Sequence, residues 1–593
     1  MVEAPTPAAN LFSFPVAAVP LSPEQRQALL PARLRAPWIT ARWLDQATDR
    51  LELSCFNQLY RRRRGSWPFS PLLLLKLALF CIADGLPSPS DWAQMANRDG
   101  PCRWLTWGLE PSASACYSFR NRLGPELLLQ LNRQVLALAM ADGLTPARRG
   151  AIDGTLQEAN ASRYRLVNAQ RLQHGLQLLE QPLPVAPQDA PMPPPAAATA
   201  ALAEPTSGNA VALAEPAPGN AVALAEPTPG NRTIPQPQRP DQGPLLPVGP
   251  SAAGLAAPAA TVPPAVAEPA AGQPRRPVRP GRTQAGRQQQ RQRWQRAQQE
   301  LQQRQARNQG KRASKRTDPA KIVLSPTDPE AAVGRDKRGV FRPLYNAQMV
   351  ADLDSELILG YEAFAQQNDN GLLPVMLQRS EQLLGHKLEL ALTDAGYTGG
   401  QELSQAEQAD VVVLGPCAGQ SSDEAASPKQ LPKSAFRYDA ERDVYVCPEG
   451  KTLACVGQSQ QKRSSVELVV LKSYRCEAQQ CQSCPRQQQC CPKSRQGRSV
   501  SRSEHEGAIE RLKQRMEQPE NKQTYKRRAA TVERLFGDGK EQRGLQRVRG
   551  RGLEQARIQL ALTVLQHNLR ILGRAMETAA QQRGDPPRER RVA

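Results

Sequence analysis

The feature that most constrains this chain is a long low-complexity stretch near its middle. Residues 180–320 are rich in Pro, Ala, Gln and Arg, and an 11-residue unit repeats there, as ALAEPTSGNAV from 201, ALAEPAPGNAV from 212 and ALAEPTPGN from 223. The unit is too short and too proline-rich for a solenoid repeat, and its composition cannot bury enough apolar surface to offset chain ordering. We therefore predict a disordered linker over 179–324, so that a folded core must combine segments from both sides of it.

The C-terminal part of this stretch is strongly basic. Residues 275–316 hold 14 Arg and Lys against one acid, Glu300, and so carry +13 of the formal +21 of the 593-residue chain. The portion around Trp294 is compatible with a helix. Such a charge favours nonspecific contact with the phosphates of DNA. A solubilising insert would have the same composition, so that alternative stays open.

Composition also bears on the compartment. The most apolar run, 71–81, is about half the length that a bilayer span needs, and the first residues lack the charged and apolar regions of a secretory signal. We expect a cytoplasmic protein with no membrane partner. The 12 cysteines then predict free thiols or a metal site, because disulfides are rare in the cytosol.

Periodicity predicts two ordered regions on either side of the linker. Residues 21–145 have the pattern of a helical domain, with an almost wholly apolar helix at 71–81 and a second helix at 125–140. After the linker come strands and helices in β-β-α-β-α-β order, at 345–351, 358–363, 371–384, 387–393, from 398, and 411–414. This order predicts an α/β core. A β-rich segment at 435–475 and helices at 505–573 follow it.

Three acidic residues stand out by their local context. Asp153 closes a short strand-like piece, Asp394 closes an apolar strand, and Glu533 lies in a predicted helix. A carboxylate at the end of a buried strand lies at the sheet edge where ligands bind in α/β folds. Three carboxylates gathered there would suit Mg²⁺ or Mn²⁺. From its local context alone, an acid at a strand end is more often a turn or cap residue.

Several short motifs follow one another in a fixed order along both flanks of the linker. They are AIDGT (151–155), DPEA (328–331), LYNAQ (344–348), LTDAGY (392–397), YKRRAATVERLFGDGK (525–540) and HNLRIL (567–572). In this order they resemble the DDE-type transposases of bacterial insertion sequences. Within these, the chain is similar to the group with a tyrosine-arginine-glutamate-lysine signature around the last catalytic acid. The resemblance covers most of residues 20–175 and 325–575 and leaves out the linker.

The resemblance implies a ribonuclease-H-like core in which Asp153, Asp394 and Glu533 are catalytic and bind Mg²⁺ or Mn²⁺. It also implies that the remaining signature residues, which are Tyr525, Arg528 and Lys540, contact DNA phosphates. The sequence departs from the signature by one residue between the arginine and Glu533, so Arg527 competes with Arg528 for its place. Gly537 and Gly539 predict that the helix frays or ends before Lys540. A solvated face of a basic helix would show the same cations.

The β-rich segment between the last two acids is rich in cysteine. Cys481 and Cys484 are separated by two residues, Cys490 follows six residues later, and Cys447 could supply a fourth thiolate. This spacing is typical of a structural zinc site closed by four protein ligands. Cys476 and Cys491 compete as ligands. A group of reduced thiols that bind no metal is the alternative.

Together with these observations, the resemblance implies a metal-dependent DNA transposase with an α/β, ribonuclease-H-like core. Its expected partners are the element's terminal repeats and target DNA, its expected location the bacterial cytoplasm at the nucleoid, and its expected state a dimer when bound to DNA. The predicted parts are a disordered N-terminus (1–20), a helical domain that recognises DNA ends (21–145), core segments (146–178, 325–430 and 501–575), the linker (179–324), a cysteine-containing insertion (431–500) and a disordered tail (576–593). A catalytically inactive, transposase-derived DNA-binding or regulatory protein, and a structural interaction protein, remain alternatives.

Overall fold

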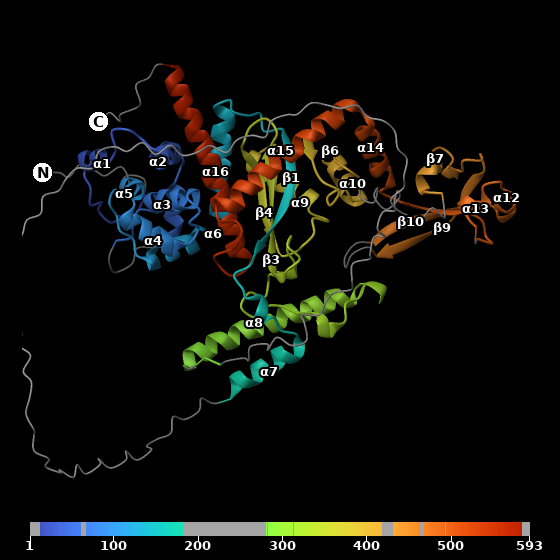
Figure 1. Ribbon diagram of the computed structural model, residues 1–593, viewed down its shortest axis with the longest axis horizontal. Helices are drawn as coiled ribbons and strands as arrows, with labels where there is room; N and C mark the ends of the chain where they lie inside the picture. Colours follow the sequence, from blue (N-terminus) through green and yellow to red (C-terminus); the bar gives the residue numbers. More distant parts are fainter. Residues whose placement is uncertain are drawn as a thin grey trace, which may run out of the picture. The chain divides into compact units, whose positions relative to one another are not determined.

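The computed structural model describes residues 12–60, 67–181, 280–281, 283–311, 313–417, 431–462, 468–492 and 494–583 (Figure 1). They belong to the larger of the two units into which the chain divides, Met1–Leu183 with Arg275–Ala593. The 11-residue repeat, and with it most of the predicted linker, lies outside the described residues, as do 1–11 and 584–593. No helix in the described ranges is long and apolar enough to cross a membrane.

A mixed sheet of six strands forms one layer of the fold. Its strands are β1 (Arg149–Glu158), β2 (Ala332–Arg335), β3 (Phe341–Asp352), β4 (Ile358–Phe364), β5 (Leu390–Leu392) and β6 (Val412–Leu414). The strand order is β2-β3-β1-β5-β6, with β4 also paired to β3. The strand β1 is antiparallel to β3 and parallel to β5, and β5 is parallel to β6. With α9 (Leu373–Leu384) and α10 (Gly400–Gln408), the predicted β-β-α-β-α-β order is confirmed.

Helices make up the part of the chain before β1. They are α1 (Pro23–Ala28), α2 (Ala36–Thr48), α3 (Pro71–Ala83), α4 (Pro89–Arg98), α5 (Gly100–Leu105) and α6 (Ala113–Ala141). The helix α3 is apolar all round and is buried accordingly. Its one charged residue, Lys76, is buried too, and its Nζ donates hydrogen bonds of 2.6 Å to both Asp45 and Asp49. In α6 the φ of Gly124 is +61°, so the predicted helix at 125–140 begins anew at Pro125.

The long C-terminal helix α16 (Leu553–Gln582) joins the N-terminal helices to the mixed sheet. It packs against α6, α2, α3 and β4, and the helical part and the sheet share one apolar core. Two buried polar residues fasten it to the sheet. Asn568 exchanges hydrogen bonds of 2.9 and 3.0 Å with the backbone N–H and C=O of Ile358, and His567 contacts the carbonyl of Glu356. Burial lowers the pKa of His567 to about 4, so it is neutral there.

The predicted linker contains ordered structure at its C-terminal end, where a helix surrounds Trp294, as the sequence allowed. The helix α7 (Ala169–Glu180) packs along α8 (Gln284–Gln309), as Figure 1 shows. The basic stretch orders because three of its few apolar side chains, which are Trp294, Ala297 and Leu301, recur on one face of α8 and bury a small core against Leu172 and Leu179. Averaged over the whole stretch, the composition hid this stripe.

A second, curled antiparallel sheet is inserted between β6 and the last helices. Its order is β11-β10-β9-β8-β7, from β7 (Arg437–Asp439), β8 (Val444–Val446), β9 (Thr452–Lys462), β10 (Leu468–Arg475) and β11 (Ser499–Ser503). Two short helices, α12 (Ala478–Gln482) and α13 (Gln487–Cys490), lie between β10 and β11. The chain then returns to the mixed sheet through α14 (Glu506–Glu517) and α15 (Pro519–Glu541).

Two predicted ends also differ from the structure. In the predicted disordered N-terminus, Phe12 is buried and its ring packs edge-on against Phe56. In the predicted tail, α16 continues to Gln582. Both stretches are short and consist mostly of polar or small residues, so composition does not predict their structure. The packing of one aromatic side chain orders the first, and the second continues a helix that begins before it.

Candidate active site

The register of the mixed sheet brings two of the predicted acids side by side. Parallel pairing of β1 with β5 ends at Ala151 and Leu392. Asp153, on β1, and Asp394, just past the end of β5, each lie two residues beyond that last pair. The prediction that Asp153 closes its strand is wrong, because β1 continues past it to Glu158 along β3. The strand β5 stops first, at Leu392, and we call the place beyond its end where Asp153 and Asp394 meet the carboxylate notch.

Arg528 lies between the two carboxylates. Its Nη2 is 3.2 Å from Oδ1 of Asp153 and 3.8 Å from Oδ2 of Asp394, and it also approaches the carbonyl of Ile152 at 3.5 Å. The side chain of Arg528 is only 14% exposed, that of Asp153 24% and that of Asp394 40%. One guanidinium thus shares its charge between two carboxylates at the mouth of the notch, and the helix α15 that carries it packs on β1 and β3.

The electrostatics of this notch favour a cation. Burial raises the pKa of the Asp153 carboxyl, and the charges of Asp394 and Asp369 raise it further, against the opposing effect of Arg528. Burial also raises the pKa of Tyr525, one turn before Arg528 on α15. A group whose pKa is raised by burial and by neighbouring anions gains from any positive charge placed beside it.

Asp369 is a residue of this region that the sequence analysis missed. Its Oδ1 accepts hydrogen bonds from Asn346 Nδ2 at 2.8 Å and from Gln348 Nε2 at 2.6 Å. Tyr397, which is fully buried, donates to Gln348 Oε1. Gly154 lies so close that a β-carbon there would overlap the Gln348 amide. The only signal in sequence was the polar pair inside the otherwise apolar strand around LYNAQ, since buried amides in a strand need partners.

The other signature residues lie at different places on α15. Arg527 donates to the carbonyl of Leu353, away from the carboxylates, whereas Arg528 faces them. Glu533 is exposed, and in the described part of the chain it has no hydrogen bond or ion pair. It follows Arg528 by five residues, which is about 140° around a helix. The structure therefore brings Asp153, Asp394, Arg528 and Tyr525 together and leaves Glu533 apart.

Lys540 corrects the prediction for the end of this helix. The helix α15 runs through Gly537 and Gly539 to Glu541 because Val532, Phe536 and Gly539 are buried against the rest of the fold, and that packing outweighs the low helix propensity of glycine. Lys540 is half-buried, and burial and the nearby charge of Lys337 lower its pKa. It lies about two turns from Glu533 along the helix axis.

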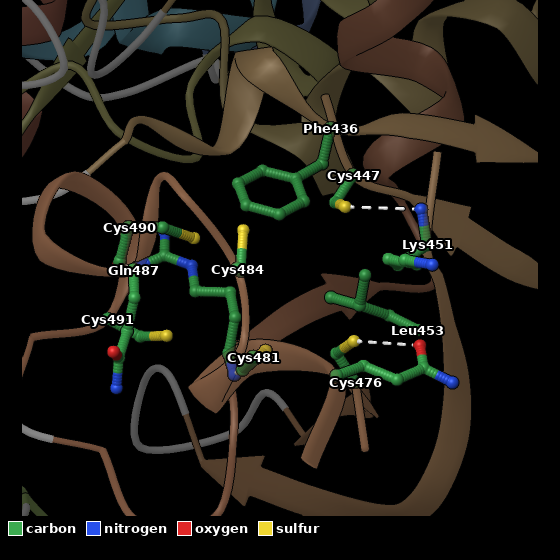
Figure 2. Close-up of a pocket in the computed structure, with 12 residues that line it drawn as sticks. Phe436, Cys447, Lys451, Leu453, Cys476, Cys481, Cys484, Gln487, Cys490 and Cys491 are labelled. Atoms are coloured by element: carbon green, nitrogen blue, oxygen red, sulfur yellow. Dashed lines mark hydrogen bonds between the residues drawn. The ribbon is translucent and has the colours of Figure 1, made fainter. Parts of the chain in front are cut away.

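The cysteines of the inserted sheet line one pocket, shown in Figure 2. Six cysteine side chains line this pocket, which are Cys447, Cys476, Cys481, Cys484, Cys490 and Cys491. Every cysteine of the chain is a free thiol. Within the described ranges, no group of three or more His, Cys, Asp or Glu side chains is already close enough to hold a metal ion, here or at the carboxylates.

Comparison with known proteins adds one finding. Residues 446–572 match a protein-family model described as a transposase DDE domain. The match spans the cysteine insertion, α14, α15 and most of α16, including Glu533, and stops short of Asp153 and Asp394. No curated protein and no solved structure matches the chain significantly. Residues 446–572 are thus a DDE transposase domain, which suggests a transposase activity, implies phosphoryl-transfer catalysis and DNA binding, and belongs to a class of enzymes that generally use divalent metal ions.

Proposed function

We propose that this chain is a DNA transposase of a bacterial insertion sequence that cleaves DNA at the ends of the element and transfers the freed 3′-hydroxyl to target DNA. The observation that carries the proposal is that Asp153 on β1 and Asp394 just after the neighbouring parallel strand β5 both face Arg528. The transposase match supports it, because the helix that holds Arg528 belongs to the matched range.

The order of the strands supports a ribonuclease-H-like core. Apart from the short β2, which pairs with β3, five strands run β4-β3-β1-β5-β6, with β3 antiparallel to both β1 and β4, and with β5 and β6 parallel to β1. This is the arrangement expected of that fold, in which the first strand and the fourth carry acids side by side. Asp153 on β1 and Asp394 after β5 occupy these two positions.

The residues of the notch fit a divalent metal ion. Asp153 and Asp394 are hard oxygen ligands, they lie on neighbouring strands, and the charge that now balances them comes from a single arginine. We infer that they hold Mg²⁺ or Mn²⁺, with Glu533 as the third ligand that the signature implies. A metal held there would supply an activated water or 3′-hydroxyl and stabilise the leaving oxygen.

The third ligand is the least supported member of this site. Glu533 reaches the carboxylates only if α15 rotates or unwinds locally, since about 140° separates it from Arg528. The one extra residue between Arg528 and Glu533 is the reason for this offset. We infer that Asp369 acts as a positioning residue, holding Gln348 under Gly154 and Tyr397 beside Asp394, and that it does not replace Glu533.

Arg528 has two roles in this proposal. It neutralises Asp153 and Asp394 in the structure described here, and with a metal at the carboxylates its charge would be repelled from them. A phosphate of the bound DNA is the partner that would then suit a guanidinium. Tyr525 lies beside Arg528 and Lys540 farther along α15, so the three could follow one strand of DNA, as the signature implies.

DNA binding is proposed for two further parts. The helices of residues 21–145 are the candidates for recognising the terminal repeats. Three arginines of α8, which are Arg291, Arg296 and Arg307, are exposed. Arg291 forms an ion pair with Glu180 and Arg307 with Glu300, and such exposed cations suit nonspecific phosphate contact. We expect two chains to act together as a dimer on paired DNA ends.

The test is cleavage of a duplex that carries the element's own end, with binding measured in parallel. Wild type should cut with Mg²⁺ or Mn²⁺, and Asp153→Asn and Asp394→Asn should bind but not cut. The second candidate is an inactive, transposase-derived DNA-binding protein, favoured by the separation of Glu533 from the other acids. Wild type that binds the ends and never cuts with either metal would establish that candidate instead.

A further inference from the structure

The cysteine pocket is a site that the transposition chemistry does not use. Its sulfur atoms come from three places that the fold brings together: the turn after β8, the segment from the end of β10 through α12 to Cys484, and the end of α13 with the residue after it. Four of the six thiols, which are Cys476, Cys481, Cys490 and Cys491, are buried, and Cys447 and Cys484 are half-buried at its rim. Figure 2 shows the side chains turned into the same space.

Two of the sulfurs already accept backbone hydrogen bonds. The N–H of Lys451 donates to Cys447 Sγ at 3.3 Å, and the N–H of Arg498 donates to Cys481 Sγ at 3.4 Å. The turn around Cys447 is closed by two backbone bonds, from Cys447 N to Lys451 O at 2.8 Å and from Gly450 N to Cys447 O at 2.9 Å. Amide donors to sulfur stabilise a thiolate and orient it, as the outer partners of metal ligands do.

The surroundings of the other two pocket cysteines, Cys476 and Cys491, make them less suited to bind a metal ion. Cys476 is a thiol donor, with its Sγ 3.7 Å from Oε1 of Gln480. Cys491 is adjacent to Cys490 in sequence, and neighbouring residues cannot easily bind one ion together. The guanidinium of Arg498 packs over Phe436 and donates to the carbonyl of Cys490 at 3.2 Å, so a fixed positive charge lies beside the sulfurs.

The inserted sheet also has little else to hold it together. Its core consists of Phe436, Tyr445, Leu453, Tyr474 and Val500 with the four buried cysteines. A unit of this size with so few apolar side chains ordinarily needs disulfides or a metal, and the cysteines are not disulfide-bonded. Gly497 allows the turn before β11 to approach the carbonyl of Cys476, since a β-carbon there would clash with it.

We propose that Cys447, Cys481, Cys484 and Cys490 bind one structural Zn²⁺. Four thiolates make a closed tetrahedral site with no open position for substrate. Binding draws the turn after β8, α12 and α13 together and thereby couples the metal to the folding of residues 431–503. Cys476 and Cys491 pack beside the metal without ligating it. The site is separate from the carboxylate notch, and its presence does not depend on the proposed reaction.

The test uses the full chain, purified without a histidine tag under reducing conditions. Elemental analysis should find near-stoichiometric zinc, and Cys481→Ser and Cys484→Ser should each lose it. Cys455→Ser is the matched control, because Cys455 is exposed on β9 outside the pocket, and it should keep its zinc. Cys476→Ser and Cys491→Ser should also keep it, and loss in either would overturn the ligand set.

Two further measurements keep the proposal open to refutation if a variant fails to fold. Wild-type protein treated with a zinc chelator should show faster amide exchange in 437–503 with little change in the mixed sheet. Thiol titration of the denatured protein should find all cysteines reduced. Folded wild type without zinc, or a disulfide among these six residues, would overturn the proposal. Zinc in a protein that never cuts DNA would instead count against the proposed transposase activity alone.

Discussion

The carboxylate notch and the cysteine pocket are assembled in opposite ways. Asp153 and Asp394 are far apart in the chain, with the low-complexity stretch between them, and only the register of β1 on β5 makes them neighbours. The six pocket cysteines come from a short segment, 447–491, folded by local turns and short helices. The notch depends on the whole mixed sheet, whereas the pocket depends on its own insertion. The two regions should therefore fail separately.

The largest expected effect comes from removing an anion at the notch. Asp153→Asn and Asp394→Asn keep the side-chain shape but remove a proposed metal ligand, so the proposed cleavage should fall by on the order of a thousandfold or more. DNA binding should survive, because cations elsewhere supply it. Cleavage and gel-shift assays on the same preparations measure this, with Asp410→Asn, at an exposed turn, as a control that should cut normally. Normal cleavage by either variant would remove that residue from the site.

Removal of the proposed Zn²⁺ should destabilise the cysteine pocket and leave the carboxylate notch unchanged. Chelation of the proposed Zn²⁺ should loosen residues 437–503, because thiolate binding and local folding are one equilibrium. The strands β3 and β4 should keep their protection from amide exchange, since they belong to a separate core. Hydrogen exchange detected by mass spectrometry resolves the two regions. Equal loosening of both would show that the insertion supports the mixed sheet.

The third acid can be settled by comparing Glu533→Gln with Asp369→Asn. If Glu533 binds metal, its amide variant should be as inactive as Asp153→Asn. Asp369→Asn should cost less, about 10- to 100-fold, because it acts through Gln348 and Tyr397. The Mg²⁺ concentration for half-maximal cleavage separates a lost ligand from a displaced one. The reverse order of effects would make Asp369 the third ligand.

As the pH falls, metal binding at the carboxylate notch should weaken at a higher pH than it would for an aspartate with an ordinary pKa. Burial raises the pKa of Asp153, so protons compete with metal until the pH exceeds this raised value. The same shift means that the folded chain binds this proton more tightly than the unfolded chain, and ionised Asp153 therefore lowers stability as pH rises through that range. Cleavage at limiting Mg²⁺, followed across pH, should recover with added metal. A loss that added metal does not reverse would point to another group.

The smallest effect is expected on α8, which belongs to neither site. Arg296 is exposed there, and Arg296→Gln should reduce the salt dependence of nonspecific DNA binding by about one unit of log–log slope while leaving cleavage chemistry unchanged. Gln295→Ala, at the neighbouring exposed position, is the control. An unchanged slope would mean that Arg296 does not meet phosphate.

The sequence predicted the elements better than their limits. The apolar helix α3 and the strands β3 and β4 follow directly from hydrophobic periodicity. The residues around Trp294 are compatible with a helix in sequence, but the polar average composition of 283–311 does not show that Trp294 and Leu301, at helical spacing, bury a core against α7. Gly537 and Gly539 predicted an early end of α15, and this was wrong, because the burial of Phe536 and Gly539 keeps the helix intact to Glu541.

Sequence by itself determined which side chains are candidates for chemistry: acids beside or within apolar strands, a strongly basic segment, and thiols at metal-ligand spacing. Those are properties of residue type and of neighbours a few positions away. Only the tertiary structure decided that Arg528 and not Arg527 faces Asp153, that Glu533 lies apart, and that Asp369 joins the notch through Asn346 and Gln348. Those outcomes depend on strand register and helix rotation, where a shift of one residue turns a side chain to another face, and contacts between distant segments set both.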